Sequence, residues 1–185
     1  RVPAEEKRED RFVSEDEPLH IEYGYSYKQI KMLNGTKLHE AGFRGEGMRV
    51  AVIDAGFMNA DRVTAFYSLR LLGTHNVVFP GKSVFVGDDH GTKVLSCLAA
   101  DIPGVMVGTA PKASYLELKS EDSDSEYPVE EDYWTAAVEY ADSAGVDEIS
   151  SSHGYFAFDT DELSYDQDAL DGRTAMISRA ANLAA

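Results

Sequence analysis

The feature of this sequence that most constrains its fold is an alternation of short apolar segments with longer segments of helical periodicity. The apolar segments predict strands over 48–54, 76–80, 113–119 and 146–152. The periodic segments predict helices within 27–43, 90–100, 129–145 and 171–185, and Asp171 is the expected N-cap of the last helix. Strands that alternate with helices form a mainly parallel sheet with helices on both faces. We therefore predict an α/β fold of three layers, α/β/α.

The size and charge of the chain indicate which classes of binding partner are expected. The chain has 185 residues, of which 43% are hydrophobic, enough for one domain with a sizeable core. Its formal net charge of −16 argues against nucleic acid as the main partner. No apolar run reaches the roughly 18 residues that suggest a membrane span, so no membrane partner is expected. Cys97 is the single cysteine, which excludes an internal disulfide.

The polar N-terminal segment differs from the rest of the chain. Residues 1–22 carry successive clusters of charge and predict an extended or weakly ordered arm. Such an arm is the remnant of a removed pro-segment or a leading linker. Residues 23–185 then form the folded part.

Polar residues at the ends of predicted strands are the candidates for chemistry. Asp54 ends the first strand, His90 begins a helix, and 152–154 follow the fourth strand. Sites in open α/β sheets form at the carboxyl ends of the strands, so these residues can converge. An aspartate that orients a histidine acting as general base makes two thirds of a nucleophilic triad. Other residues have structural interpretations: Trp134 in the core, Cys97 facing the sheet, and His39 and His75 at the surface or in loops.

Four segments together resemble the subtilases, the subtilisin-like serine proteases. "GEGMRVAVIDAGF" resembles their catalytic-aspartate motif, and "HGTKVLSCLAA" resembles their catalytic-histidine motif. "GTAPKASYLELK" resembles the segment and strand that follow, and "VDEISSSHGY" resembles the strand before a substrate-binding S-x-G. The resemblance covers roughly 23–185 in family order. It implies the first half of a subtilisin-like peptidase domain.

The resemblance also implies roles for particular residues. Asp54 would orient His90, and His90 would take the proton from a serine that attacks a peptide carbonyl. A peptide or protein substrate would lie as an extended strand along the rim. The substrate-binding residues would be Glu126, Tyr127 and Pro128 on one side, and Ser152, His153 and Gly154 on the other. The expected activity is that of an endopeptidase, secreted or in the cell envelope of a bacterium.

Three departures from the family pattern limit this interpretation. Lys93 stands where a second histidine is usual, and His153 stands where a small apolar residue is commoner. The helix that begins at His90 lacks the inserted loop that builds the high-affinity calcium site of bacterial subtilisins, so that site is not expected. Calcium binding stays possible but no site is assigned, and no cofactor is expected. The acidic residues of 120–132 are interpreted as a solvated rim.

No serine in the sequence fits the family's nucleophile motif. Ser96 and Ser178 fall within predicted helices, and Ser152 falls at a strand end. The chain alone is therefore expected to be inactive, with the serine in the C-terminal half of the same protease as its partner. The alternatives are an isolated fragment and a binding module or pseudoprotease.

Two other α/β classes fit less well. A phosphorelay receiver domain needs an acidic pair at an earlier strand end than Asp54, and no such strand precedes it. A dinucleotide-binding domain needs Gly-x-Gly-x-x-Gly after the first strand, and "DAGFMNA" lacks it.

Overall fold

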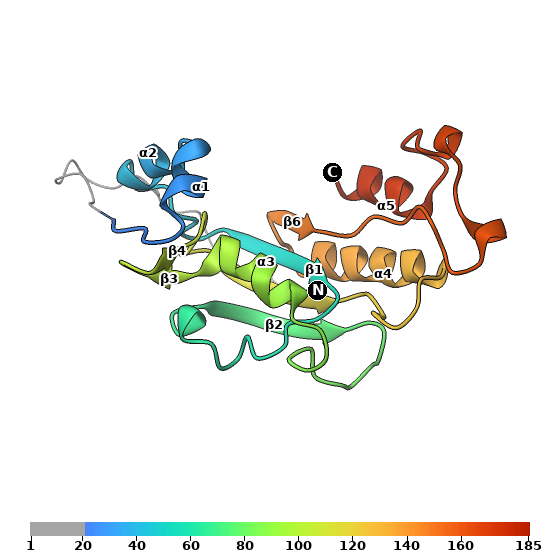
Figure 1. The fold of residues 1–185 in the computed structure, drawn as a ribbon, viewed down its shortest axis with the longest axis horizontal. Coiled ribbons are helices and arrows are strands. Elements are labelled where there is room, and N and C mark those ends of the chain that lie inside the picture. Colours follow the sequence, from blue (N-terminus) through green and yellow to red (C-terminus); the bar gives the residue numbers. More distant parts are fainter. Residues whose placement is uncertain (1–20) are drawn as a thin grey trace.

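A parallel sheet of four strands forms the centre of the molecule (Figure 1). The structure is a computed structural model that describes residues 21–185, so the predicted arm of 1–22 lies almost wholly outside the described residues. The strand order is β2-β5-β1-β6, and all three pairings are parallel. The strands are β1 (Arg49–Asp54), β2 (Arg70–Asn76), β5 (Ser114–Lys119) and β6 (Glu148–Ser151).

Helices cover both faces of this sheet, which confirms the predicted three layers. One face packs against α3 (His90–Ala99) and the short 3₁₀ helix η1 (Thr64–Phe66). The other face packs against α4 (Val129–Ser143), which in turn contacts α5 (Met176–Ala184). Two further 3₁₀ turns, η2 (Asp161–Leu163) and η3 (Gln167–Ala169), precede α5.

A smaller unit adjoins the end of the sheet at which β1 begins (Figure 1). It consists of α1 (Tyr27–Met32), α2 (Gly35–Glu40) and an antiparallel pair, β3 (Asp101–Ile102) with β4 (Met106–Val107). No helix among the described residues is long and apolar enough to cross a membrane.

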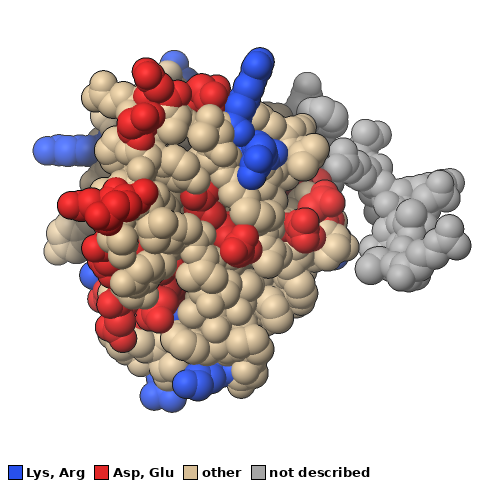
Figure 2. All heavy atoms as spheres, turned by 90° about the vertical axis from the view of Figure 1, so that its right-hand side faces the viewer, with Lys and Arg blue, Asp and Glu red and all other residues tan. Residues whose placement is uncertain are grey.

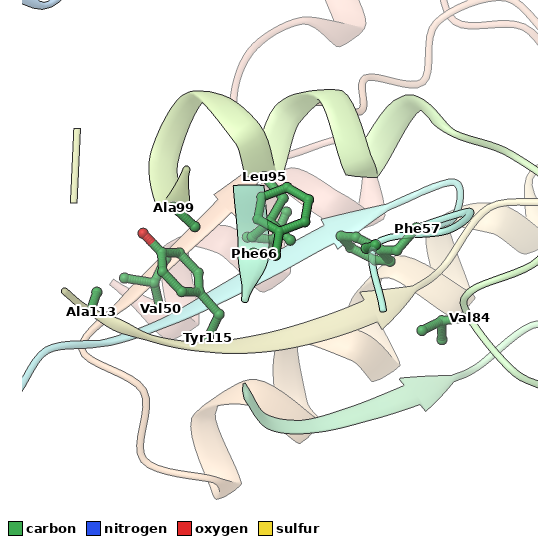
Figure 3. Packing of buried hydrophobic residues seen from close by; sticks show 10 residues of the cluster. Val50, Phe57, Phe66, Val84, Leu95, Ala99, Ala113 and Tyr115 are labelled. Carbon is green, nitrogen blue, oxygen red and sulfur yellow. The ribbon is translucent and has the colours of Figure 1, made fainter. Parts of the chain in front are cut away.

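Strand β1 is buried on both faces. Val50 and Val52 point toward the α3 side, where they share a cluster with Leu95 and Tyr115 (Figure 3). Ala51 and its neighbour Ile53, on alternate positions of the strand, belong to the cluster on the α4 side. Each large apolar side chain buried this way contributes about 1.5–3 kcal/mol. The packing of both layers therefore fixes the carboxyl end of β1.

The predicted strand over 76–80 is wrong. The observed strand β2 ends at Asn76, whose Oδ1 accepts the backbone N–H of Phe79 at 2.8 Å and turns the chain. Gly81, with φ of 82°, completes the reversal. Because β2 lies at the sheet edge, much of it is exposed, and its residues lack the apolar signal of a buried strand.

The last helix begins later than predicted. Asp171 does not cap it, because α5 starts at Met176. Instead, Oδ1 of Asp171 accepts the backbone N–H groups of Arg173 and Thr174, both at 2.7 Å, in a local turn. A free backbone N–H in the first turn of α5 finds its acceptor on another helix, because Oε2 of Glu131 in α4 accepts the N–H of Ile177 at 3.1 Å.

Of three predictions for single residues, the one for Trp134 is confirmed, and those for Cys97 and His39 are wrong. Trp134 is in the core, as predicted, and its Nε1 donates to Ser151 Oγ at 2.8 Å. Cys97 is exposed and does not face the sheet, because Leu95 and Ala99 occupy that face of α3.

His39 is also not a surface residue. Its side chain is buried, with Nε2 donating to the carbonyl of Thr109 at 2.8 Å. A carbonyl only accepts, so in the neutral ring Nδ1 accepts the hydroxyl of Tyr23, at 3.0 Å. These bonds join α2 to the segment after β4 and to the chain before α1.

Candidate active site

Asp54 is held at the carboxyl end of β1 with its carboxylate fully buried. Oδ1 accepts two hydrogen bonds, from Nδ1 of His90 at 2.8 Å and from the backbone N–H of Ala55 at 2.8 Å. Oδ2 is buried and has no hydrogen-bond partner among residues 21–185. A buried carboxylate is costly unless it is hydrogen-bonded or paired with a positive charge, and the His90 ring provides this partner.

His90 is the first residue of α3, and its ring is half exposed. Its backbone N–H donates to Oδ1 of Asp88 at 2.7 Å, which satisfies one free donor at the helix start. Because the carboxylate of Asp54 only accepts, Nδ1 carries the proton of the neutral ring. Nε2 is then a lone-pair nitrogen, and no described residue forms a hydrogen bond with it. This is the arrangement of a general base that has room for a reacting group.

Two glycines bring the helix start against the strand end. The N–H of Gly91 donates to the carbonyl of Gly56 at 2.9 Å. A Cβ at Gly91 would lie 2.5 Å from that carbonyl oxygen and 2.9 Å from Cβ of Asp54. No side chain fits there. Gly91 therefore sets the approach of His90 to Asp54, and Thr92 adds a bond from Oγ1 to the carbonyl of Met58 at 2.9 Å.

The surroundings of His90 and Lys119 shift the pKa values of both side chains. The hydrogen bond to Asp54, together with its negative charge, raises the pKa of His90. Lys119 lies opposite Asp54 in the β1–β5 register, and its buried Nζ donates to the carbonyl of Ala55. Burial lowers the pKa of Lys119. Lys119, at the end of a predicted strand, loosely fits the receiver-domain alternative but is not part of the predicted protease site.

A pocket of about 370 Å³ opens beside His90. Four of the six predicted substrate-binding residues line it: Glu126, Ser152, His153 and Gly154. The remaining two, Tyr127 and Pro128, do not; Pro128 directly precedes α4, and the side chain of Tyr127 is partly exposed. The pocket also includes residues that sequence analysis did not select, Asp88, Glu121, Ser123 and Tyr155.

The backbone on the two sides of the pocket differs in how far its hydrogen-bonding groups are already used. The N–H of Glu126 donates to Oδ2 of Asp159 at 3.2 Å, and the carbonyl of Glu126 accepts the N–H of Asp159 at 2.9 Å. Gly154, on the other side, is exposed, and a Cβ there would meet nothing within 4 Å. In 152–154 the N–H of His153 makes only a long contact, of 3.5 Å, with Oγ of Ser151, whereas Asp159 occupies both backbone groups of Glu126. The backbone that is more accessible to an extended peptide therefore lies beside 152–154.

Acidic side chains are more prominent than basic ones on the face that contains the carboxyl ends of the strands (Figure 2). In Figure 1 the arrows of β1 and β2 point to the right, and Figure 2 shows that side of the molecule with many acidic and few basic residues. Among residues 21–185, however, no group of three or more histidine, cysteine, aspartate or glutamate side chains is arranged to hold a metal ion.

No protein-family model and no curated protein matches the sequence. Solved structures do match. MycP1 with its N-terminal propeptide removed is 20% identical with a TM-score of 0.60, over 91% of this chain and 46% of that chain. MycP1 is described as a serine protease and an essential component of the type VII (ESX-1) secretion system.

Two further structures have the same architecture. Fervidolysin from Fervidobacterium pennivorans, a keratinolytic enzyme related to subtilisin, is 18% identical with a TM-score of 0.58, over 87% of this chain and 23% of that chain. The prenylagaramide maturation protease PagA is 23% identical with a TM-score of 0.51, over 80% and 46%. The chain thus spans less than half the length of these proteins. It has the subtilisin-like fold that its motifs predict.

Proposed function

We propose that this chain supplies the aspartate and the histidine of a subtilisin-like serine endopeptidase. The observation that carries the proposal is the 2.8 Å bond between Oδ1 of Asp54 and Nδ1 of His90. The same histidine lines a pocket, and its Nε2 has no hydrogen-bond partner among the described residues, which supports a role as base. The fold, shared with known serine proteases, supports the same reaction class.

In the proposed reaction, Nε2 of His90 takes the hydroxyl proton of a serine as its oxygen attacks the substrate carbonyl. Asp54 keeps Nδ1 protonated and stabilises the imidazolium that forms. His90 then gives the proton to the leaving amine, and a water molecule repeats the sequence to release the acyl group. These steps need no bound cofactor.

The serine is proposed to lie outside these 185 residues, in a C-terminal part of the same protease. Support comes from the absence of any hydrogen bond from a described serine to Nε2 of His90, and from the longer chains of the structural neighbours. The substrate is proposed to be an extended peptide beside 152–154. An exported location, secreted or at a bacterial cell envelope, is supported by the description of MycP1 as a secretion-system component.

A fluorophosphonate probe tests this proposal, because it reacts covalently only with an activated serine. The full-length protein should be labelled at one serine outside residues 1–185, as located by mass spectrometry of its peptides. The chain of 185 residues, treated in parallel, should remain unlabelled. Failure of the full-length protein to react would favour the binding module, and labelling inside residues 1–185 would refute the placement of the nucleophile.

The pH dependence of hydrolysis provides a second prediction. His90 must be neutral to accept a proton, and Asp54 raises its pKa above the ordinary value of 6.5. We therefore expect kcat/KM to be low in acid and to rise with a midpoint above 6.5. Initial rates on one peptide in constant-ionic-strength buffers measure this. A flat profile between about pH 5 and 9 would contradict the role of His90.

A further inference from the structure

We infer that the pocket beside His90 selects a lysine or arginine side chain of the substrate, and that Glu121 and Glu126 recognise it. This inference rests on the proposed endopeptidase function and specifies its substrate class. The pocket adjoins both His90 and the open backbone of 152–154, so a peptide bound along that backbone can place one side chain in it.

The first argument is the charge of the pocket wall. Among the described residues, three carboxylates line it, from Asp88, Glu121 and Glu126, and the only basic side chains are the imidazoles of His90 and His153. Both oxygens of Asp88 are used, since they accept the N–H of His90 and, at 3.1 Å, the hydroxyl of Ser123. The wall therefore carries more negative than positive charge.

The two glutamates differ in their contacts. Oε2 of Glu121 lies 2.9 Å from Nε2 of His153, and this contact lowers the pKa of Glu121, so the carboxylate is ionised at neutral pH. The side chain of Glu126 has no hydrogen bond or ion pair among the described residues. Burial raises the pKa of Glu126, and the charges of Glu121 and Asp159 raise it further. A cation between the glutamates would relieve this repulsion.

The second argument is an unsatisfied hydroxyl in the same wall. Tyr155 lines the pocket with 5% of its surface exposed, and its hydroxyl has no hydrogen-bond partner among residues 21–185. Burial raises the pKa of this hydroxyl, and the charges of Glu121 and Glu130 raise it further. A buried polar group without a partner is costly, and a substrate ammonium or guanidinium group could donate to the phenolic oxygen.

The charge of the wall, more than its apolar surface, decides the preferred side chain. The rings of His153 and Tyr155 lie with centroids 6.3 Å apart, but the His153 side chain and Tyr155 are each only 5% exposed, so neither ring offers much contact to a hydrocarbon stem. The carboxylates of Glu121 and Glu126 provide acceptors for the charged end of lysine or arginine, whereas an acidic side chain would be repelled.

Paired peptides test the inference in the full-length protein. Each pair carries lysine or its uncharged analogue norleucine at one of the four positions before the cleaved bond. At one position, kcat/KM for lysine should exceed that for norleucine about tenfold, the size of one charge-assisted hydrogen bond. The ratio should approach one in the double variant Glu121→Gln/Glu126→Gln. The control Glu139→Gln/Asp142→Asn removes the same two negative charges at exposed positions of α4 and should leave the ratio unchanged.

The outcomes separate this inference from the proposed function. Suppose that the protein reacts with fluorophosphonate but shows no lysine preference, or that the double variant keeps the preference. The inference about the pocket is then wrong, and the proposed protease function still stands. If the protein does not cleave peptides, calorimetry with the same pairs decides. Binding of the lysine peptide about tenfold more tightly than the norleucine peptide supports the inferred selectivity of the pocket, and equal dissociation constants overturn it.

Discussion

His90→Ala is expected to lower kcat of the full-length protein by about 10⁶-fold, with little change in KM. The ring is half exposed and lines the pocket, and the Asp54 bond leaves Nε2 as its lone-pair nitrogen. In the proposed reaction, loss of this nitrogen leaves the serine hydroxyl without a base and the leaving amine without a proton donor. The proposed substrate contacts of 152–154 and of the glutamates stay in place, so binding should persist.

Hydrolysis of a fluorogenic peptide measures kcat and KM, and thermal unfolding checks that the fold is retained. His75→Ala is the matched control, because it removes an imidazole that stacks on Tyr140 at 4.6 Å and does not line the pocket. His75 is half-buried in β2, but it lies outside the pocket, so this control should keep kcat within about twofold. A loss below about 100-fold in His90→Ala would mean that another group is the base.

The positions of Asp54 at a strand end and of His90 at a helix start could be predicted because each lies next to a strong local signal. Asp54 follows a run of apolar residues, and His90 precedes a periodic helix and is followed by Gly91. Parallel topology then brings a strand end and a helix start to the same rim. The sequence did not reveal why Gly91 is needed, since the close contact with Gly56 joins two segments far apart in the chain.

Other features depended on long-range contacts or on weak local signals. The edge strand β2 leaves Leu71 and Leu72 exposed, so its pattern resembles a loop more than a buried strand. The start of α5 is set by Glu131, which belongs to α4. The backbone of Glu126 is occupied by Asp159, a pairing that no motif encodes. In each case, the deciding partner or neighbour is distant in sequence.

Asp54→Asn should lower kcat by about 10⁴-fold, for a reason specific to this site. Oδ1 of Asp54 accepts both the Ala55 N–H and the His90 Nδ1–H. An asparagine amide group at the Oδ1 position would oppose the N–H of Ala55. It would also donate to Nδ1 of His90 and move the ring proton to Nε2, where it blocks base catalysis. An amide group at the Oδ2 position would be a buried donor without a partner among the described residues.

In either orientation the negative charge is lost, and the imidazolium is no longer stabilised. The pKa of His90 should fall, so the acidic limb of the pH–rate profile should move to lower pH. Rates across pH and the ¹H–¹⁵N signals of the His90 ring measure both effects. Lower activity with an unshifted limb would indicate a structural role for Asp54.

Glu117→Gln separates the role of Asp54 from the general effect of removing a buried carboxylate. Glu117 lies on the neighbouring strand β5, is fully buried, and has no hydrogen-bond partner for either oxygen among residues 21–185. Burial raises its pKa to about 7, so its charge costs free energy in the fold. The variant should keep kcat and the acidic limb unchanged, because Glu117 does not line the pocket. If Glu117→Gln instead matched Asp54→Asn, loss of buried charge anywhere in the sheet would explain both variants, and the pairing of Asp54 with His90 would not be the cause.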